Sequence, residues 1–209
     1  MRDNAIEGQG LASLRRLQIR LKRTLIYEVA NRYNDFTMRK VVLSVAVSLD
    51  GFIEGPNGEY DWCVIDPDYS FAEFFERLDT IFVGRKTYEV TSAAESPEGF
   101  PKFKEYVFST TLDKVKEGTT LINGDIKNEV ERIKKEAGKD IWLFGGAGLA
   151  TSLLNLGLVD ELSLAVYPVI LGGGKPLFHN INDRIILTLV EAKRSSSGTV
   201  SLIYNVGQK

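Results

Sequence analysis

Two stretches of the chain indicate its fold: residues 81–88, Ile-Phe-Val-Gly-Arg-Lys-Thr-Tyr, and residues 141–149, Ile-Trp-Leu-Phe-Gly-Gly-Ala-Gly-Leu. Each passes from an apolar, strand-like segment into a helical pattern, so each predicts a strand-to-helix turn. The first backbone N–H groups of a helix lack partners inside it and can bind an anion. The first turn adds two cations, and the glycines of the second let a ligand approach the backbone closely. Together they predict a site for a dinucleotide with an additional phosphate.

The remaining sequence alternates strand and helix patterns. Residues 40–47 form a continuous apolar run, as expected for a strand covered on both faces. We expect further strands at residues 80–83, 106–109, 119–122, 141–144 and 161–170, helices at 68–78, 85–90, 125–138 and 149–156, and a closing hairpin at 185–192 and 199–206. This order predicts an α/β fold with a mostly parallel central sheet and an antiparallel C-terminal hairpin.

Residues 1–37 differ from the domain predicted for residues 38–209. Leucines recur there at helical spacing with basic residues between them, which predicts a basic amphipathic extension. Such a helix can pack on a partner or a membrane surface. An appendage or an upstream extension without a role, with Met38 as the start of the folded unit, is the favoured interpretation.

The composition narrows the function classes. The chain has 209 residues, of which 44% are hydrophobic, enough for one sizeable core. A net charge of −2 does not favour nucleic acid as a partner. Cys63 and His179 are the only residues of their types, which excludes a disulfide within the chain and a Cys/His zinc site. No apolar run reaches membrane-spanning length and no signal-peptide pattern is present, so we expect a cytoplasmic protein without membrane attachment.

Cations and hydroxyls mark the first predicted anion site. Arg85 and Lys86 begin a helix, where basic residues are disfavoured unless an anion rests there. Ser109 and Thr110 end the next strand, and hydroxyls beside an arginine suit a phosphate monoester such as the 2′-phosphate of NADPH. Two solvated cations and a polar turn are the simpler alternatives.

The glycine run and two further residues complete the predicted site. Gly145-Gly146-Ala147-Gly148 departs from the G-x-G-x-x-G spacing, so tight packing alone can explain it, although the helix that follows suits a pyrophosphate. Asp50 follows the first strand at the edge where open α/β sheets bind ligands, and Trp62 is placed to close that crevice. A turn-forming Asp and a core-covering Trp are equally good interpretations. We expect His179 in a loop and Cys63 as a small buried residue, and no catalytic residue is assigned.

Four motifs in this order resemble the dihydrofolate reductase-like superfamily, and most closely the stand-alone relatives of the reductase domain of bacterial bifunctional riboflavin-biosynthesis proteins. They lie at residues 48–53 (SLDGFI), 83–88 (VGRKTY), 144–148 (FGGAG) and 170–178 (ILGGGKPLF). The resemblance covers residues 38–206 and leaves residues 1–37 outside. It implies a three-layer sandwich around the central sheet and, because members are commonly dimers, a homodimer.

The resemblance also implies NADPH as hydride donor and a division of roles. The phosphates are assigned to Gly84, Arg85, Lys86 and Thr87, and the 2′-phosphate to Arg85 with Ser109 and Thr110. Gly145, Gly146, Ala147, Gly148 and Leu149 are assigned to the pyrophosphate and nicotinamide, with a cis Gly145–Gly146 peptide. The substrate crevice is assigned to Asp50, Phe52, Trp62, Asp68 and Phe71.

One departure from this pattern bears on the substrate. Dihydrofolate reductases carry an acid in the first helix, where this chain has Phe71, with Asp68 nearly a turn earlier and Glu73 facing elsewhere. Because pterin reduction needs a proton as well as a hydride, a ring-opened sugar is the favoured acceptor, as in 5-amino-6-(5-phosphoribosylamino)uracil reductase. The alternatives are dihydrofolate or pteridine reduction with Asp68 or water as acid, and a non-catalytic nucleotide-binding dimer module. One His and one Cys exclude the zinc deaminase of the bifunctional proteins.

Overall fold

The computed structural model describes residues 38–66, 68, 71–94 and 99–207. The chain divides into two units, Met1–Met38 and Arg39–Lys209, and the account below concerns the second. The basic amphipathic extension predicted for residues 1–37 lies outside the described residues.

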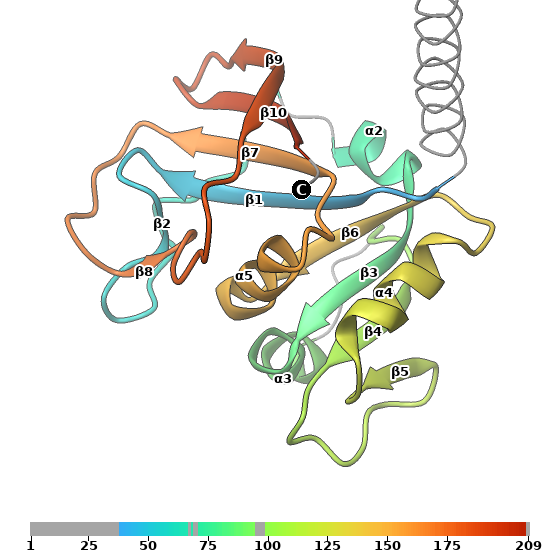
Figure 1. Cartoon of the computed structure of the whole chain (residues 1–209). Coiled ribbons are helices and arrows are strands. Elements are labelled where there is room, and N and C mark those ends of the chain that lie inside the picture. The colour runs from blue at the N-terminus through green and yellow to red at the C-terminus, as the bar shows by residue number, and fades with distance from the viewer. Residues whose placement is uncertain (1–37, 67, 69–70, 95–98, 208–209) are drawn as a thin grey trace, which may run out of the picture. The chain divides into compact units, whose positions relative to one another are not determined.

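An eight-stranded sheet forms the centre of this unit (Figure 1). Its five neighbours β4, β3, β6, β1 and β7 pair in parallel, β5 pairs in parallel with β4, and β10 and β9 are antiparallel. The predicted mostly parallel sheet with an antiparallel C-terminal hairpin is therefore confirmed. In spatial order the strands are β5 (Thr119–Ile122), β4 (Lys104–Phe108), β3 (Leu78–Gly84), β6 (Asp140–Gly145), β1 (Val41–Ser48), β7 (Glu161–Tyr167), β10 (Val200–Val206) and β9 (Leu187–Arg194).

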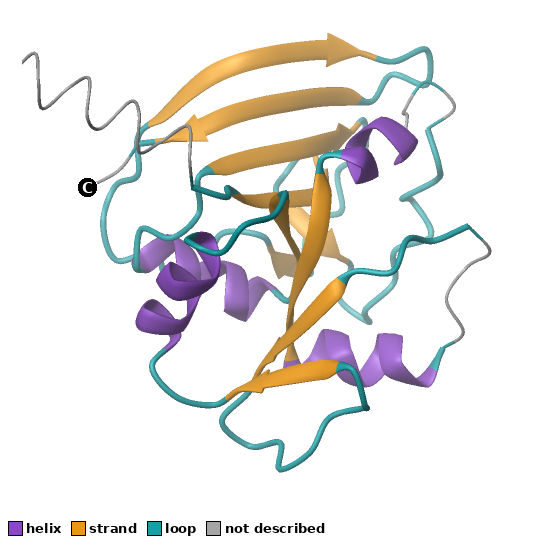
Figure 2. Cartoon of the chain, turned by 90° about the vertical axis from the view of Figure 1, so that its right-hand side faces the viewer, coloured by secondary structure: helices purple, strands orange, loops and turns teal. Residues whose placement is uncertain are grey.

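Helices cover both faces of the sheet, which gives the three layers that were predicted (Figure 2). On one face, α4 (Ile126–Lys134) and α5 (Ala147–Asn155) bury Val130, Ile133 and Leu153 in the larger core cluster. On the other face, α2 (Phe71–Glu76) and α3 (Arg85–Ala93) add Phe74 and Tyr88 to a second cluster. As predicted, Asp125 caps α4, its carboxylate accepting from the Asn128 N–H at 3.1 Å.

Several element boundaries differ from the sequence-based ones. The predicted helix 68–78 is α2 alone, because Leu78 belongs to β3, where it is buried in the second core cluster. The predicted strand 161–170 stops at Tyr167, since Pro168 has no N–H to continue the ladder. A small unpredicted ribbon, β2 (Phe52–Glu54) with β8 (Lys175–Pro176), joins the loops that follow β1 and β7.

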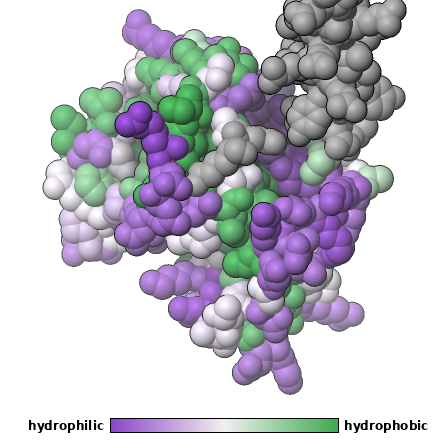
Figure 3. Space-filling view, viewed as in Figure 1, coloured by the Kyte–Doolittle hydropathy of each residue, from purple (hydrophilic) through white to green (hydrophobic). Residues whose placement is uncertain are grey.

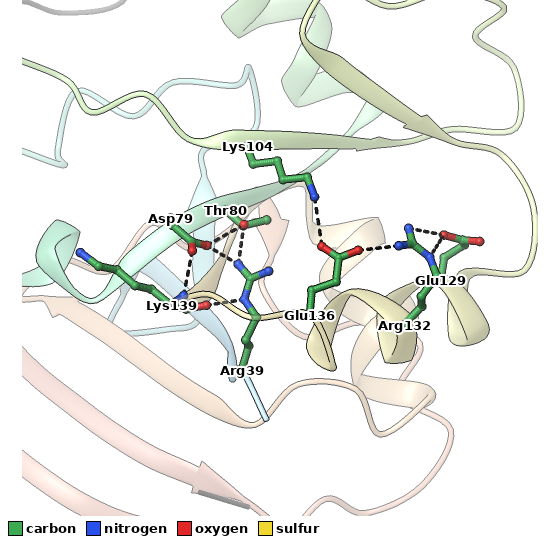
Figure 4. A network of polar contacts seen from close by, with 8 residues as sticks. All are labelled: Arg39, Asp79, Thr80, Lys104, Glu129, Arg132, Glu136 and Lys139. Carbon is green, nitrogen blue, oxygen red and sulfur yellow. Dashed lines mark hydrogen bonds and ion pairs between the residues drawn. The ribbon is translucent and has the colours of Figure 1, made fainter. Parts of the chain in front are cut away.

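Ion pairs line the amino edge of the sheet, where the parallel strands begin. The Arg39 guanidinium donates to the Asp79 carboxylate and to the Lys139 carbonyl (Figure 4). Arg77 binds Glu161 at 2.7 Å and Asp140 at 2.8 Å. Burial lowers the pKa of Arg77, but the two carboxylates outweigh it and the net pKa is raised. Figure 4 also shows a more exposed network, in which Glu136 joins Lys104 to Arg132 and Glu129.

Candidate functional site

The two glycine turns meet at the carboxyl edge of the sheet. Strands β3 and β6 are parallel neighbours, with Val83 paired to Gly145, so α3 and α5 start side by side. A Cβ on Gly146 would lie 3.5 Å from Thr87 Oγ1 and 3.8 Å from Gly84 Cα. The two stretches that indicated the fold therefore form one continuous surface, with a helix N-terminus on each side.

The first side of this surface carries the two cations. Gly84 is the N-cap of α3 and offers no side-chain acceptor to the first N–H groups of the helix. Lys86 is exposed, and within the described part of the chain it takes part in no ion pair. The Arg85 guanidinium is held at 2.8 Å by the Glu89 carboxylate one turn further along α3. An anion at this helix start therefore meets one unpaired cation and one that must be released from a carboxylate.

The second side is formed by the backbone at the start of α5. Ala147 and Leu149 are buried in the core, so they offer a ligand only backbone N–H groups. Gly146 has φ 92° and ψ 106°, a conformation that L side chains rarely adopt. The predicted cis Gly145–Gly146 peptide is wrong, since the bond is trans. The positive φ of Gly146, rather than a cis bond, turns the chain from β6 into α5.

The strand register places the predicted hydroxyls beside α3. Phe108 at the end of β4 pairs with Gly84, so Ser109 lies next to the start of that helix. The Ser109 hydroxyl accepts from the N–H groups of Thr111 at 3.1 Å and Leu112 at 3.0 Å. Its oxygen also lies 3.4 Å from Thr111 Oγ1, a long contact that the Ser109 O–H can exchange for a hydrogen bond to an anion. Thr110 is exposed in the same turn.

Asp50 joins two loops at the ends of β1 and β7. Its carboxylate accepts from Ser48 Oγ at 2.7 Å and from the N–H groups of Leu171 at 3.1 Å and Gly172 at 2.8 Å. The pKa of Asp50 is lowered, first by the Ser48 hydroxyl and then by these backbone donors. Phe52, in β2, is joined to the same group because its N–H donates to Ser48 Oγ. Asp50 thus holds the glycine-rich loop 171–174 in place.

Trp62 lies over the end of β7. Its ring meets that of Tyr167 edge-on with centroids 5.6 Å apart, and the Tyr167 hydroxyl donates to the Val64 carbonyl at 2.6 Å. Burial, and then the neighbouring Cys63 thiol, raises the pKa of Tyr167 to about 12. Trp62 Nε1 is buried and has no acceptor among the residues described. A buried donor without a partner indicates a place where a ligand acceptor fits.

Asp68 and Phe71, both predicted in the substrate crevice, have different surroundings in the structure. The Asp68 carboxylate accepts from the Ser196 N–H at 2.7 Å in the β9–β10 turn. Phe71 is exposed at the start of α2, and its ring lies 5.9 Å from Phe75 at the border of an aromatic cluster. This aromatic cluster extends to the half-buried end of β6. Its further members are Phe74, Phe100, Phe103, Trp142 and Phe144.

Other expectations concern single residues and absences. His179 lies in a loop as expected, with its carbonyl accepting from Thr151 Oγ1 at 3.1 Å. Cys63 is a free thiol and only half-buried. In the described ranges, no group of three or more His, Cys, Asp or Glu residues is placed to hold a metal ion. No helix among the described residues is long and apolar enough to cross a membrane.

Solved structures with the same fold define the class. The chain superimposes on a protein from Shewanella sp. PV-4 assigned to riboflavin biosynthesis, with a TM-score of 0.71, 23% identity and coverage of 81% of this chain and 99% of the other. Dihydrofolate reductase from Enterococcus faecalis, solved with NADP(H), matches with a TM-score of 0.56 and 17% identity over 81% of this chain and 97% of the enzyme. The fold is therefore that of a dihydrofolate reductase-like domain.

Sequence similarity identifies the family. The RibD C-terminal domain family matches residues 39–201. The uncharacterized protein YyaP of Bacillus subtilis (strain 168) is 44% identical over 183 residues, which cover 82% of this chain and 97% of YyaP. The chain belongs to the RibD C-terminal domain family, a family of reductase domains of the riboflavin-pathway type.

Proposed function

We propose that this protein is an NADPH-dependent oxidoreductase that transfers hydride to a small heterocyclic or sugar-derived acceptor, in the manner of 5-amino-6-(5-phosphoribosylamino)uracil reductase. The observation that carries the proposal is the adjacency of two helix starts, one with Arg85 and Lys86 and one formed by the backbone after Gly145. Two anion sites with added cations match a dinucleotide that has a further phosphate. The family to which the chain belongs supports the redox class.

The described residues fit this cofactor. Gly84 and Gly146 leave room where side chains would fill the surface between the helices. Arg85, Lys86, Ser109 and Thr110 would hold the 2′-phosphate, with Thr87 beside the glycine turn, and the first N–H groups of α5 would hold the pyrophosphate. The cofactor supplies the hydride when bound. The chain's own task is to align donor and acceptor and to exclude water between them.

The carboxylates of the predicted substrate crevice favour a sugar-derived acceptor over a pterin. A general acid works best with a pKa near the working pH. The pKa values of Asp50 and Asp68 are both lowered, by the Ser48 hydroxyl and the Ser196 N–H respectively, and Phe71 occupies the position of the helix acid. Both carboxylates therefore stay ionised at neutral pH. An open-chain sugar aldehyde can take its proton from water, whereas a pterin ring nitrogen needs a positioned donor.

We also propose a cytoplasmic homodimer that forms through the C-terminal hairpin. Strand β9 ends the sheet and all eight of its residues are exposed, including Leu189 and Val190. Figure 3 shows hydrophobic side chains at the surface over this part of the sheet. An uncovered sheet edge with apolar side chains favours pairing with a second copy.

Cofactor binding tests the proposal directly. We expect NADPH to raise the melting temperature more than NADH, because charge-assisted hydrogen bonds to the 2′-phosphate give about 10- to 100-fold tighter binding. The Arg85→Ala variant should abolish this preference. Arg132→Ala is the matched control, since Arg132 is an exposed, ion-paired arginine on α4. Equal shifts with NADPH and NADH in the unchanged protein would refute the assignment of the phosphate site.

A substrate panel separates the enzymatic alternatives. Loss of NADPH absorbance with a phosphoribosylaminopyrimidine, but not with dihydrofolate, is the expected result. Turnover of dihydrofolate would instead support pterin reduction. Stabilisation by NADPH without turnover of any acceptor would indicate a nucleotide-binding module, an outcome that the phenylalanine at the position of the helix acid makes worth testing.

A further inference from the structure

A cluster of serines and carboxylates ties the loop before α2 to the far end of the chain. We call residues 60–66 the strap, and Asp66 and Asp68 with the turn Ser195–Ser197 the latch. Asp66 is buried, and its carboxylate accepts from Ser195 Oγ at 2.5 Å, from Ser197 Oγ at 2.6 Å and from the Asp68 N–H at 2.9 Å. The two serines thus bind one carboxylate from both sides, across about 130 residues of sequence.

Asp68 doubles this attachment. Its carboxylate accepts from the Ser196 N–H at 2.7 Å and lies 3.1 Å from Ser195 Oγ, whose single proton it shares with the closer Asp66. Ser197 Oγ also lies 3.0 Å from Thr199 Oγ1, which fixes the hydroxyl inside the turn. In the latch, the carboxylates of Asp66 and Asp68 thus accept from the Ser196 N–H and from the hydroxyls of Ser195 and Ser197 in the β9–β10 turn.

The latch lies at the same edge of the sheet as the candidate site. Strand β10 starts with Val200 opposite Val166, next to Tyr167 at the end of β7 (Figure 1). Tyr167 is also the residue that holds the middle of the strap, through Val64 and through the ring of Trp62. The strap is thus fixed at two points, by Tyr167 in its middle and by the latch at its end. Trp62 contacts Tyr167 at the first point and precedes the latch in the sequence.

Two properties of the strap indicate a role beyond core packing. Ile65 and Val64 are 81% and 60% exposed, so the latch holds large aliphatic side chains in water rather than burying them. Trp62 Nε1, in contrast, is buried without an acceptor among the described residues. A segment that carries both apolar side chains and an unsatisfied donor has the composition expected of a ligand-binding wall.

We propose that Asp66, Ser195 and Ser197 are positioning residues that hold the strap, and through it Trp62, against the acceptor end of the crevice. This inference rests on the proposed reductase function as far as the acceptor is concerned. The closing of the strap by the hairpin turn does not depend on it and can be measured without turnover.

Cys63 makes that measurement possible, because it is the only cysteine of the chain and lies within the strap. We expect an aromatic disulfide reagent to modify this thiol about 10-fold faster in the Ser195→Ala/Ser197→Ala double variant, since two hydrogen bonds that close the strap are lost. Ser201→Ala, on β10 and outside the latch, should react like the unchanged protein. Equal rates in the double variant and the unchanged protein would overturn the proposal.

The role of the latch in acceptor binding is tested by measuring the acceptor and NADPH separately. In the double variant the KM for the acceptor should rise about 10-fold while the Kd for NADPH stays constant, and Ser195→Thr, which keeps a hydroxyl, should recover most of the loss. Faster thiol modification with an unchanged acceptor KM would overturn the positioning role. If the double variant fails to fold, Asp66→Asn gives the same two measurements. If no acceptor is turned over, the reductase proposal fails, while the thiol rates still decide whether the latch closes the strap.

Discussion

The two edges of the central sheet are built from the same strands but differ in how their charges are used. At the amino edge, Lys134 binds both carboxylate oxygens of Asp160, at 2.8 and 2.7 Å, and Arg77 joins Asp140 to Glu161. At the carboxyl edge, the cations of α3 are half-buried or exposed, and the starts of α3 and α5 have no side-chain caps. One edge satisfies its charges internally, whereas the other leaves donors for a ligand.

This difference teaches where stability and binding reside. Burying the ion pairs of the amino edge costs desolvation free energy. Removing one partner of a buried pair is nevertheless strongly destabilising, because the other charge then stays buried without a counter-ion. Uncapped helix starts and a positive-φ glycine at the carboxyl edge give up stability that a bound anion can restore. Substitutions at the amino edge should therefore change unfolding, and substitutions at the carboxyl edge should change ligand affinity.

The largest effect is expected at Lys134. Its side chain is 8% exposed and that of Asp160 is 16% exposed, so Lys134→Met leaves a largely buried carboxylate without its cation, with the Val41 N–H at 2.7 Å as a remaining donor. We expect the free energy of unfolding, measured in urea, to fall by about 3 kcal/mol, with no change in NADPH affinity. Lys104→Met, at the exposed pair with Glu136, should cost less than about 1 kcal/mol. A large loss of NADPH binding in the Lys134 variant would break the division between the edges.

The next effect is expected at Gly146, where the carboxyl edge turns into α5. Alanine must adopt the φ of 92° that glycine has here, which costs about 1–2 kcal/mol of stability, and its methyl group enters the surface between the helices. Gly146→Ala should therefore lower both the melting temperature and NADPH affinity, the latter by about 10-fold. Gly148→Ala is the control for stability. Gly148 belongs to α5, and a Cβ there would have no neighbour within 4 Å beyond the helix itself, so alanine should raise the melting temperature.

Much of this edge follows from local sequence. Residues 81–88 and 141–149 each contain a complete strand end, turn and helix start, so each turn can be recognised from its own stretch. Their adjacency comes from the parallel pairing of β3 with β6. Boundaries were less predictable where one residue suits two patterns: Leu78 continues the helical spacing of Phe71 and Phe74, yet packs as the first residue of β3.

The roles of the acidic residues could not be derived in the same way. The sequence placed Asp50 correctly at the carboxyl edge, but its donors, Leu171 and Gly172, lie about 120 residues later. Asp66 and its partners Ser195 and Ser197 are likewise 129 and 131 residues apart in the sequence. Nothing in the local pattern distinguishes a carboxylate that binds a ligand from one that binds a distant turn, because both are polar residues in loops.

A smaller effect sharpens the description of the carboxyl edge. Glu89 holds Arg85 at 2.8 Å and must release it before Arg85 binds a phosphate. Glu89→Gln frees the Arg85 guanidinium and removes a negative charge that would repel the phosphate. NADPH affinity should therefore rise about 3-fold while NADH affinity stays constant. Glu129→Gln, which breaks a comparable pair with Arg132 on α4, should change neither. An unchanged NADPH affinity after Glu89→Gln would place the phosphate away from Arg85.

The smallest effect concerns pH and the latch, which satisfies its carboxylates with hydroxyls and N–H groups instead of cations. The Ser195 hydroxyl, then that of Ser197, lowers the pKa of Asp66 from 3.8 to about 2. A carboxyl with a lowered folded-state pKa stabilises the fold above its unfolded pKa and loses this contribution as the pH falls toward the folded value. The stability difference between the unchanged protein and Asp66→Asn should thus be constant from pH 8 to about pH 4 and shrink between pH 3.8 and about 2, as followed by urea unfolding. A difference that already shrinks between pH 7 and 5 would mean that Asp66 titrates near neutrality, and the latch would then be a switch rather than a permanent closure.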